Sequence, residues 1–135
     1  MDQMTLHIET YLNPTESEEK VKRAVCNLFG DLQWAVKPTQ KGSILSAESK
    51  RLDALSSLRN ILRRDHILDA SRKALYNGLR DNKLVIYLNK EVAFAGHVSF
   101  SEAEAESPLG PIKVTLQTDY PQQLIDWLAP RTCKS

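Results

Sequence analysis

The stretch that decides the fold reads LVIYLNKEVAFAGHVSF at residues 84–100 and, after an acidic connection, SPLGPIKVTL at residues 107–116. It contains three runs of β-forming residues, and turn-forming residues separate them. Strands that are near neighbours in sequence usually pair antiparallel. We therefore expect strands at residues 84–88, 96–100 and 112–116, in a sheet onto which the other elements pack.

The size and composition are those of an ordinary globular chain. Its 135 residues suffice for one full core, so we expect a single domain over residues 1–135. A formal net charge of +1 excludes a strong overall attraction to nucleic acid or membrane. Apolar runs are shorter than the ~20 residues of a membrane span, and the two cysteines, Cys26 and Cys133, lie far apart. These features predict a reduced, cytoplasmic chain with no membrane partner.

Hydrophobic patterning predicts the elements that come before this sheet. Apolar and polar residues alternate over residues 4–12, as in a strand with one buried face. A capping box that begins at Thr15 predicts a helix ending at Gly30. Further alternation predicts strands at residues 32–36 and 43–47.

Prolines and acidic residues mark several boundaries. Pro38 is expected to end the second strand. Asp119 is expected to cap a final helix, with Pro121 in its first turn. The segment Ser101–Glu106, which alternates Ala with Glu, is expected to be an exposed loop.

Residues 50–78 have helical spacing, but they do not predict one straight helix. Their apolar residues before and after residue 65 would fall on opposite sides of a continuous helix. Either the helix breaks near Asp65 and His66, or one half faces a second subunit. We favour the break, with Asp65 as the N-cap of the second helix.

The expected order is β-α-β-β-α-α-β-β-β-α. Because strands and helices do not alternate regularly, we predict an α+β, two-layer fold. The helices are expected on one face of a largely antiparallel sheet.

No sequence motif indicates a catalytic or metal site. The three histidines have no partner at a usual ligand spacing, and the chain has neither a nucleophile elbow nor a phosphate-binding loop. We therefore predict no enzyme activity, no cofactor and no metal.

A local excess of basic residues lies between Arg59 and Lys73. Arginines at the end of a helix stabilise it through the helix dipole, so a solvated helix surface is one interpretation. The other is a surface for RNA, on which each cation neutralises one phosphate and Phe94 and Tyr87 offer stacking surfaces. The candidate phosphate-binding residues are Arg63, Arg64, Arg72, Lys73 and Lys90.

Four blocks of sequence resemble the archaeal "uncharacterised protein family 0201". They are RDHILDASR at residues 64–72, LNKEVAFAG at 88–96, ESPLGPI at 106–112 and IDWLAPRT at 125–132. The resemblance covers nearly the whole chain and implies a fold like that of ribosomal protein L5, a homodimer, and RNA binding with an exosome-type complex as partner. In the family a basic residue is usual at the positions of His66 and His97. This departure implies RNA contact that is weaker, or stronger at acid pH.

The leading hypothesis is a non-enzymatic, homodimeric RNA-binding module that contacts the phosphate backbone. The alternative is a homodimeric protein-interaction or scaffold subunit without nucleic-acid contact, with Ile86 and Leu68 at the dimer interface. A third hypothesis is an enzyme or small-acid binder that uses Arg63 or Arg72 as a clamp for a carboxylate or phosphate.

Overall fold

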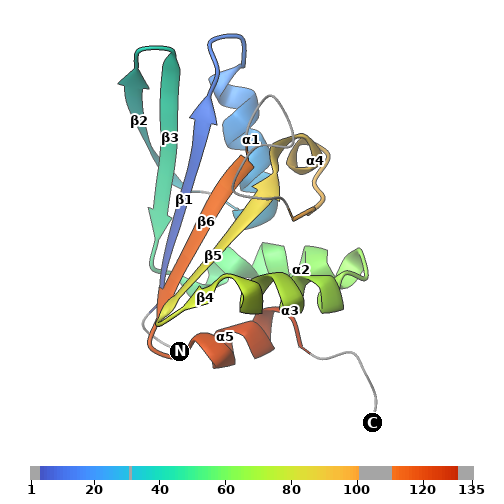
Figure 1. Cartoon of the computed structure of the whole chain (residues 1–135). Helices are drawn as coiled ribbons and strands as arrows, with labels where there is room; N and C mark the ends of the chain where they lie inside the picture. Colours follow the sequence, from blue (N-terminus) through green and yellow to red (C-terminus); the bar gives the residue numbers. More distant parts are fainter. Residues whose placement is uncertain (1–3, 31, 101–110, 131–135) are drawn as a thin grey trace.

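The framework of the protein is a six-stranded antiparallel sheet in the order β2-β3-β1-β6-β5-β4 (Figure 1). The computed structural model describes residues 4–30, 32–100 and 111–130. The strands are β1 (Met4–Leu12), β2 (Gln33–Thr39), β3 (Gly42–Ser49), β4 (Leu79–Arg80), β5 (Lys83–Asn89) and β6 (Pro111–Thr118). The predicted α+β class and the antiparallel sheet are confirmed.

Strand β1 lies inside the sheet, between β3 and β6. Leu6 pairs with Ser49 of β3 on one side and with Leu116 of β6 on the other. Every second residue of β1, from Met4 to Leu12, is buried. This is the alternation predicted from the sequence, because successive side chains of a strand point to opposite faces of the sheet.

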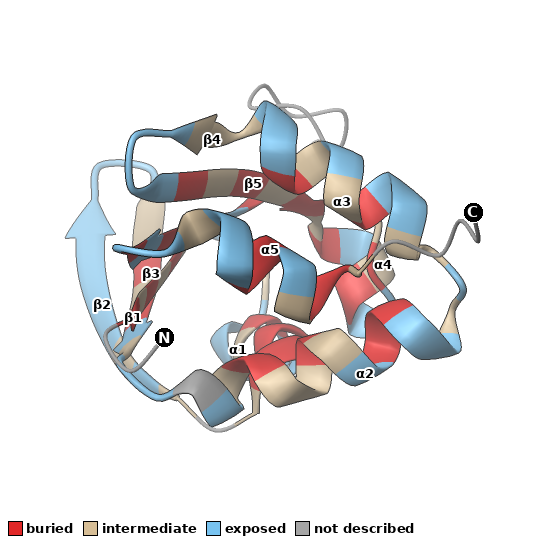
Figure 2. Ribbon diagram, turned by 90° about the horizontal axis from the view of Figure 1, so that it is seen from below, coloured by how far each residue is buried: buried red, intermediate tan, exposed pale blue. Residues whose placement is uncertain are grey.

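The helices gather on one side of the sheet, which curves round them (Figure 2). They are α1 (Glu18–Phe29), a 3₁₀ helix (Leu52–Leu55), α2 (Ser56–Arg64), α3 (Leu68–Asn77), α4 (Lys90–Phe94) and α5 (Pro121–Leu128). Between sheet and helices lies a core to which Leu6 of β1, Leu28 of α1 and Ile125 of α5 each contribute a fully buried side chain. Burial of this apolar surface is the main force that holds the two layers together.

Helix α1 has a different N-cap from the predicted one. The cap is Ser17, whose hydroxyl accepts from the Lys20 amide (3.4 Å), and not Thr15. The carboxylate of Glu16 instead accepts from the backbone N–H of Asn13 (3.0 Å), which bends the chain before the helix starts. Gly30 ends the helix as predicted, with a φ of 75° that favours glycine.

The predicted break in the middle helical region is confirmed. His66 has a φ of 58°, which stops α2 and turns the chain into α3. Asp65 does not cap α3, because the N-cap is Ile67 and no side chain bonds there. Asp65 is the C-cap of α2, so its carboxylate is available for other partners.

The predicted strand at residues 96–100 is wrong. Among the described residues, only Phe100 of this segment forms a bridge, an isolated one with Leu88. The side chain of Asn89 caps α4 by accepting from the Val92 amide (3.1 Å), so a helical turn starts where β5 ends. In place of this strand, the short β4 pairs with the start of β5.

Two boundary predictions also need correction. Pro38 lies inside β2 and pairs with Ser43, because β2 is an edge strand and its missing N–H costs little there. The N-cap of α5 is Tyr120 and not Asp119, although Pro121 occupies the first turn as predicted. The predicted loop Ser101–Glu106 and Cys133 lie outside the described residues.

Candidate nucleic-acid interface

Two of the predicted phosphate-binding residues, Arg63 and Arg64, occupy the last turn of α2. Both are exposed. Their cations lie at the negative end of the helix dipole, which stabilises the helix end. The left-handed residue His66 then carries the chain away, so nothing prolongs the helix beyond this pair.

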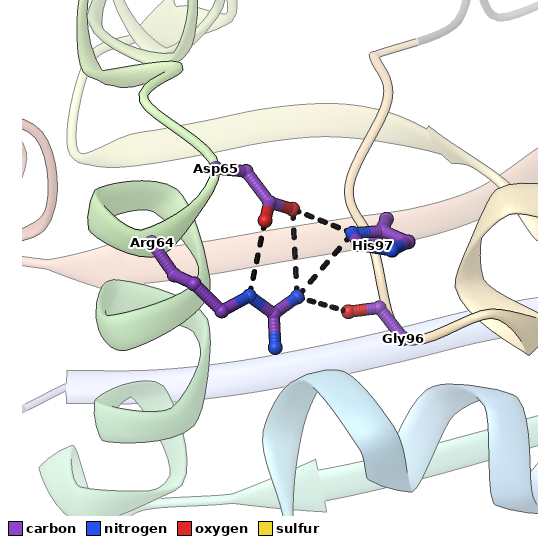
Figure 3. A network of polar contacts seen from close by, with 4 residues as sticks. All are labelled: Arg64, Asp65, Gly96 and His97. Atoms are coloured by element: carbon purple, nitrogen blue, oxygen red, sulfur yellow. Dashed lines mark hydrogen bonds and ion pairs between the residues drawn. The ribbon is translucent and has the colours of Figure 1, made fainter.

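Arg64 is fixed by a network that joins α2 to the segment after α4 (Figure 3). Its Nε donates to Oδ1 of Asp65 (3.0 Å), and one terminal nitrogen donates to the carbonyl oxygen of Gly96 (2.8 Å). The Nδ1 of His97 lies 2.8 Å from Oδ2 of Asp65. This short distance to a carboxylate oxygen requires that Nδ1 carry a proton, since two lone pairs would repel.

The network also sets the charge state of Asp65. Hydrogen bonds from Arg64 and then from His97 stabilise the carboxylate, and they lower the pKa of Asp65 below its ordinary value of 3.8. Asp65 is therefore ionised at neutral pH and compensates the charge of Arg64. The other terminal nitrogen of Arg64 points away from Asp65 in Figure 3 and has no drawn contact.

Beside this network, α1, α2 and α4 border a groove of about 460 Å³, which we call the α2–α4 groove. Arg64 and Asn60 of α2, Asn27 of α1 and Phe94 of α4 are among its lining residues. The ring of Phe94 is 40% exposed, so part of its face is accessible from the groove. The amide of Asn27 donates to the carbonyl oxygen of Ala93 (3.3 Å), which fastens α4 to α1.

The groove combines three kinds of group that bind nucleotides. An aromatic face stacks on a base, side-chain amides form hydrogen bonds with base edges, and a guanidinium binds phosphate. Phe94, which the sequence suggested as a stacking surface, lies on α4 and lines the groove together with residues of α2. The two asparagines were not found from the sequence, because isolated amides carry no spacing signal.

Arg72 and Lys73 lie elsewhere, on α3. The guanidinium of Arg72 donates to Asp126 (2.7 Å) and to the carbonyl oxygen of Ala129 (3.1 Å), and it lies over the ring of Tyr76. Arg72 therefore fastens α3 to α5, whereas Arg64 joins α2 to the segment after α4. Lys73 is exposed. The basic cluster of the sequence is thus divided between two surfaces.

Lys90 is placed in the interior, where a phosphate on the surface cannot reach it. Its side chain is fully buried, and its ammonium donates to the carbonyl oxygen of Tyr11 (2.6 Å) and to Glu16 (3.1 Å). Burial lowers the pKa of Lys90, and the hydrogen bond with Glu16 opposes that shift in part. This pair could not be predicted from spacing, because its two members are 74 positions apart.

The two predicted interface residues also face inward. Ile86 is 4% exposed and belongs to the core, and Leu68 at the start of α3 packs against that core. Neighbouring positions of β5, Val85 and Tyr87, are half-buried and alternate with the core positions, so they lie on the opposite face of the sheet.

Other chemical features are few in the described part of the chain. No group of three or more His, Cys, Asp or Glu side chains there is arranged to hold a metal ion. Over the same residues, no helix is long and apolar enough to cross a membrane. The thiol of Cys26 is free and half-buried.

Comparisons with known proteins agree with the expected family. A protein-family model described as RNA binding matches residues 5–118. The chain is 45% identical over 127 residues to a UPF0201 protein of Sulfurisphaera tokodaii, and the match covers 94% of this chain and 88% of that protein. It is 42% identical over 127 residues to a UPF0201 protein of Thermococcus kodakarensis, with 94% and 90% covered.

A solved structure shows the same fold. The crystal structure of a UPF0201 protein from Methanococcus jannaschii superposes with a TM-score of 0.84 at 29% sequence identity. The superposition covers 96% of this chain and 95% of that one. The expected likeness to ribosomal protein L5 stays a prediction.

Proposed function

This chain belongs to the UPF0201 family, and on that premise we propose that it binds RNA through the arginines at the end of α2. The observation that carries the proposal is the match of residues 5–118 to the family model described as RNA binding. One of the two interpretations of the basic cluster, a surface for RNA, names the same class of ligand. Both sources describe a ligand whose backbone is a row of negative charges.

The geometry at the end of α2 supports this proposal. The side chain of Arg63 is exposed, and no hydrogen bond or ion pair joins that side chain to another described residue. Arg64, next to it, is held in one orientation by Asp65 and Gly96. A fixed guanidinium loses less side-chain freedom on binding than a free one, and the terminal nitrogen that Asp65 and Gly96 leave unused can donate to a phosphate oxygen.

Arg63 and Arg64 are the central phosphate contacts of the proposal. Arg72 and Lys73 extend the interface only for an RNA long enough to pass from α2 onto α3. Lys90 has no part in it, because its ammonium is buried against Glu16.

The proposal is tested by a salt series with an RNA oligonucleotide, measured by filter binding or fluorescence anisotropy. Affinity should decrease linearly on a double-logarithmic plot as salt increases. Arg63→Gln should weaken binding and reduce the slope by about 0.7–0.9, which corresponds to one phosphate contact. The matched control is Lys37→Gln on the exposed edge strand β2, which should leave the slope unchanged.

Absent retention of RNA, or affinity independent of salt, would overturn the proposal. An equal effect of Arg63→Gln and Lys37→Gln would show that only net charge matters and would remove the site from α2. The proposal involves no catalysed reaction, so cleavage or modification of the RNA during incubation would also contradict it.

We propose in addition that the protein is a homodimer, formed through the sheet face that points away from the helices. The half-buried side chains Val85 and Tyr87 support this, because each places apolar surface on that face. The test is sedimentation velocity on Tyr87→Glu, which should yield a folded monomer. Ile86→Asp is unsuitable because it would place a charge in the core. An unchanged mass for Tyr87→Glu would exclude this face.

The remaining parts of the proposal rest on the family resemblance and on composition. They are a cytoplasmic location and an association with an exosome-type complex. Affinity purification of the protein from its own cells tests the association, which would be contradicted if exosome subunits were recovered no better than in a mock purification.

A further inference from the structure

We propose that the α2–α4 groove holds an unpaired base of single-stranded RNA, with the ring of Phe94 as its stacking surface. The inference rests on the proposed RNA binding and names the class of RNA that this site accepts. The first observation is that Phe94, the last residue of the five-residue helix α4, is 40% exposed. Ala93, the residue before it, is fully buried. The fold buries one side of α4 and leaves this ring in the groove.

The surroundings of the ring fit a nucleotide in shape and in chemistry. The groove has a volume of about 460 Å³, within the ~300–1,000 Å³ of typical small-ligand sites. The amide groups of Asn27 and Asn60 line it together with Phe94. Amides both donate and accept, so they suit the edge of a base, which presents both kinds of group.

Charge complements the backbone of the same nucleotide. Arg64 borders the groove at the end of α2, with the exposed Arg63 next to it. On α1, the exposed Arg23 lies one turn before Asn27 and the exposed Lys20 two turns before it, on the same stripe of the helix. Cations therefore lie on α1 and on α2, two of the three helices that border the groove, where the backbone of a strand would run.

Geometry favours a single strand over a duplex. In a duplex both faces of each base are stacked on neighbours, so a protein ring in a groove finds no free face. An unpaired base can turn outward and stack on an aromatic side chain. Duplex RNA would meet only the cations of this surface.

The experiment compares two probes by fluorescence anisotropy at low salt: a labelled single-stranded oligouridine and a labelled blunt RNA duplex. The variants are Phe94→Leu, which removes the ring but keeps an apolar side chain, and Phe94→Tyr, which keeps the ring. The control is Tyr120→Leu, because Tyr120 is also an exposed ring at a helix end, 54% exposed before α5 and away from the groove.

We expect Phe94→Leu to weaken binding of the single strand by roughly 5- to 100-fold. Duplex binding should change by less than about twofold, since it depends on phosphate contacts alone. Phe94→Tyr should bind the single strand as tightly as the wild type does, and Tyr120→Leu should leave both affinities unchanged.

Two outcomes overturn the inference in different ways. The groove is not a base site if Phe94→Leu binds the single strand as well as Tyr120→Leu does, or if it loses affinity for both probes equally. In that case, salt-dependent binding by the wild type would still support the proposed function. If the wild type binds neither probe, the proposed function fails and the inference fails with it. Circular dichroism of each variant shows whether it is folded. If Phe94→Leu is not folded, Asn60→Ala in the same groove replaces it, and this variant should weaken binding of the single strand but not of the duplex.

Discussion

Replacing Lys90 by Met should strongly destabilise the protein. The Lys90 side chain is fully buried, and its ammonium donates to the Tyr11 carbonyl (2.6 Å) and to Glu16, whose own side chain is only 6% exposed. Met fills a similar volume but leaves the carboxylate of Glu16 buried without its cation. Removing one partner of a buried ion pair costs about 3–5 kcal/mol. Because a domain is stable by only about 5–15 kcal/mol, the unfolding midpoint should decrease by roughly 10–20 °C.

The assay is urea unfolding followed by circular dichroism, with two companion variants. Glu16→Gln in the Lys90→Met background removes the stranded charge but keeps an oxygen to accept from Asn13, so it should recover about 1–3 kcal/mol. Lys22→Met is the matched control, because Lys22 pairs with Glu18 at 2.9 Å on the surface of α1. That exposed pair should contribute less than about 0.5 kcal/mol.

Two results would refute this reasoning. One is a loss of stability for Lys90→Met no greater than for Lys22→Met, which would show that burial does not strengthen the pair. The other is additivity, in which Glu16→Gln destabilises the Lys90→Met protein as much as it destabilises the wild type. Either result would mean that the carboxylate of Glu16 does not depend on Lys90.

The pH dependence of stability provides a second check on the same residue. Burial lowers the pKa of Lys90 in the folded protein, so at alkaline pH the unfolded chain binds more protons than the folded one. Stability contributed by this group therefore rises with pH, from the folded pKa up to the unfolded value of 10.5. Lys90→Met should lack this contribution, and an unchanged slope in that window would contradict the burial of the ammonium.

Three further predictions concern other contacts. Arg59→Met should lower the free energy of unfolding in urea by about 1–2 kcal/mol, because it removes the hydrogen bond to the Trp127 carbonyl (2.9 Å) and the contact of the guanidinium with the Trp127 ring. An unchanged free energy of unfolding would contradict this prediction. Asp65 has a lowered pKa, so its contribution to stability is present above pH 3.8 and is lost as the pH falls through the folded pKa; Asp65→Asn should flatten an acid titration of the melting temperature in that range. Gly78→Ala should cost about 1–3 kcal/mol in a thermal melt, because a Cβ would overlap the carbonyl oxygen of Val85, and wild-type stability would refute the close approach.

Much of the fold could be predicted because burial leaves a periodic signal in the sequence. The alternation over residues 4–12 and the opposed stripes around residue 65 both record which side chains face the core. The prediction of a strand at residues 96–100 failed because β-forming residues express only a weak local preference for extended structure. The Asn89 cap starts a helical turn just before it, and the φ of 79° at Gly96 interrupts an extended chain.

The candidate site was predicted less completely, because its parts come from distant segments. Arg63 and Arg64 were found from local charge, and their place at a helix end was expected. The hydrogen bond from Arg64 to the Gly96 carbonyl spans 32 positions, and no pattern of spacing predicts such a contact. Lys90 was misplaced for the same reason, since a lysine in a short polar turn has the same sequence signal whether it is exposed or buried.

The strand order has a consequence for synthesis on the ribosome. Strand β6 is the last strand of the described chain to be made, yet it is inserted between β1 and β5, and Met4 pairs with Thr118. Until it emerges, the nascent protein carries two half-sheets, each with an unpaired inner edge of the kind that joins readily to other chains. Because the strand that joins the two half-sheets is made last, both edges can pair with other chains until β6 has been synthesised.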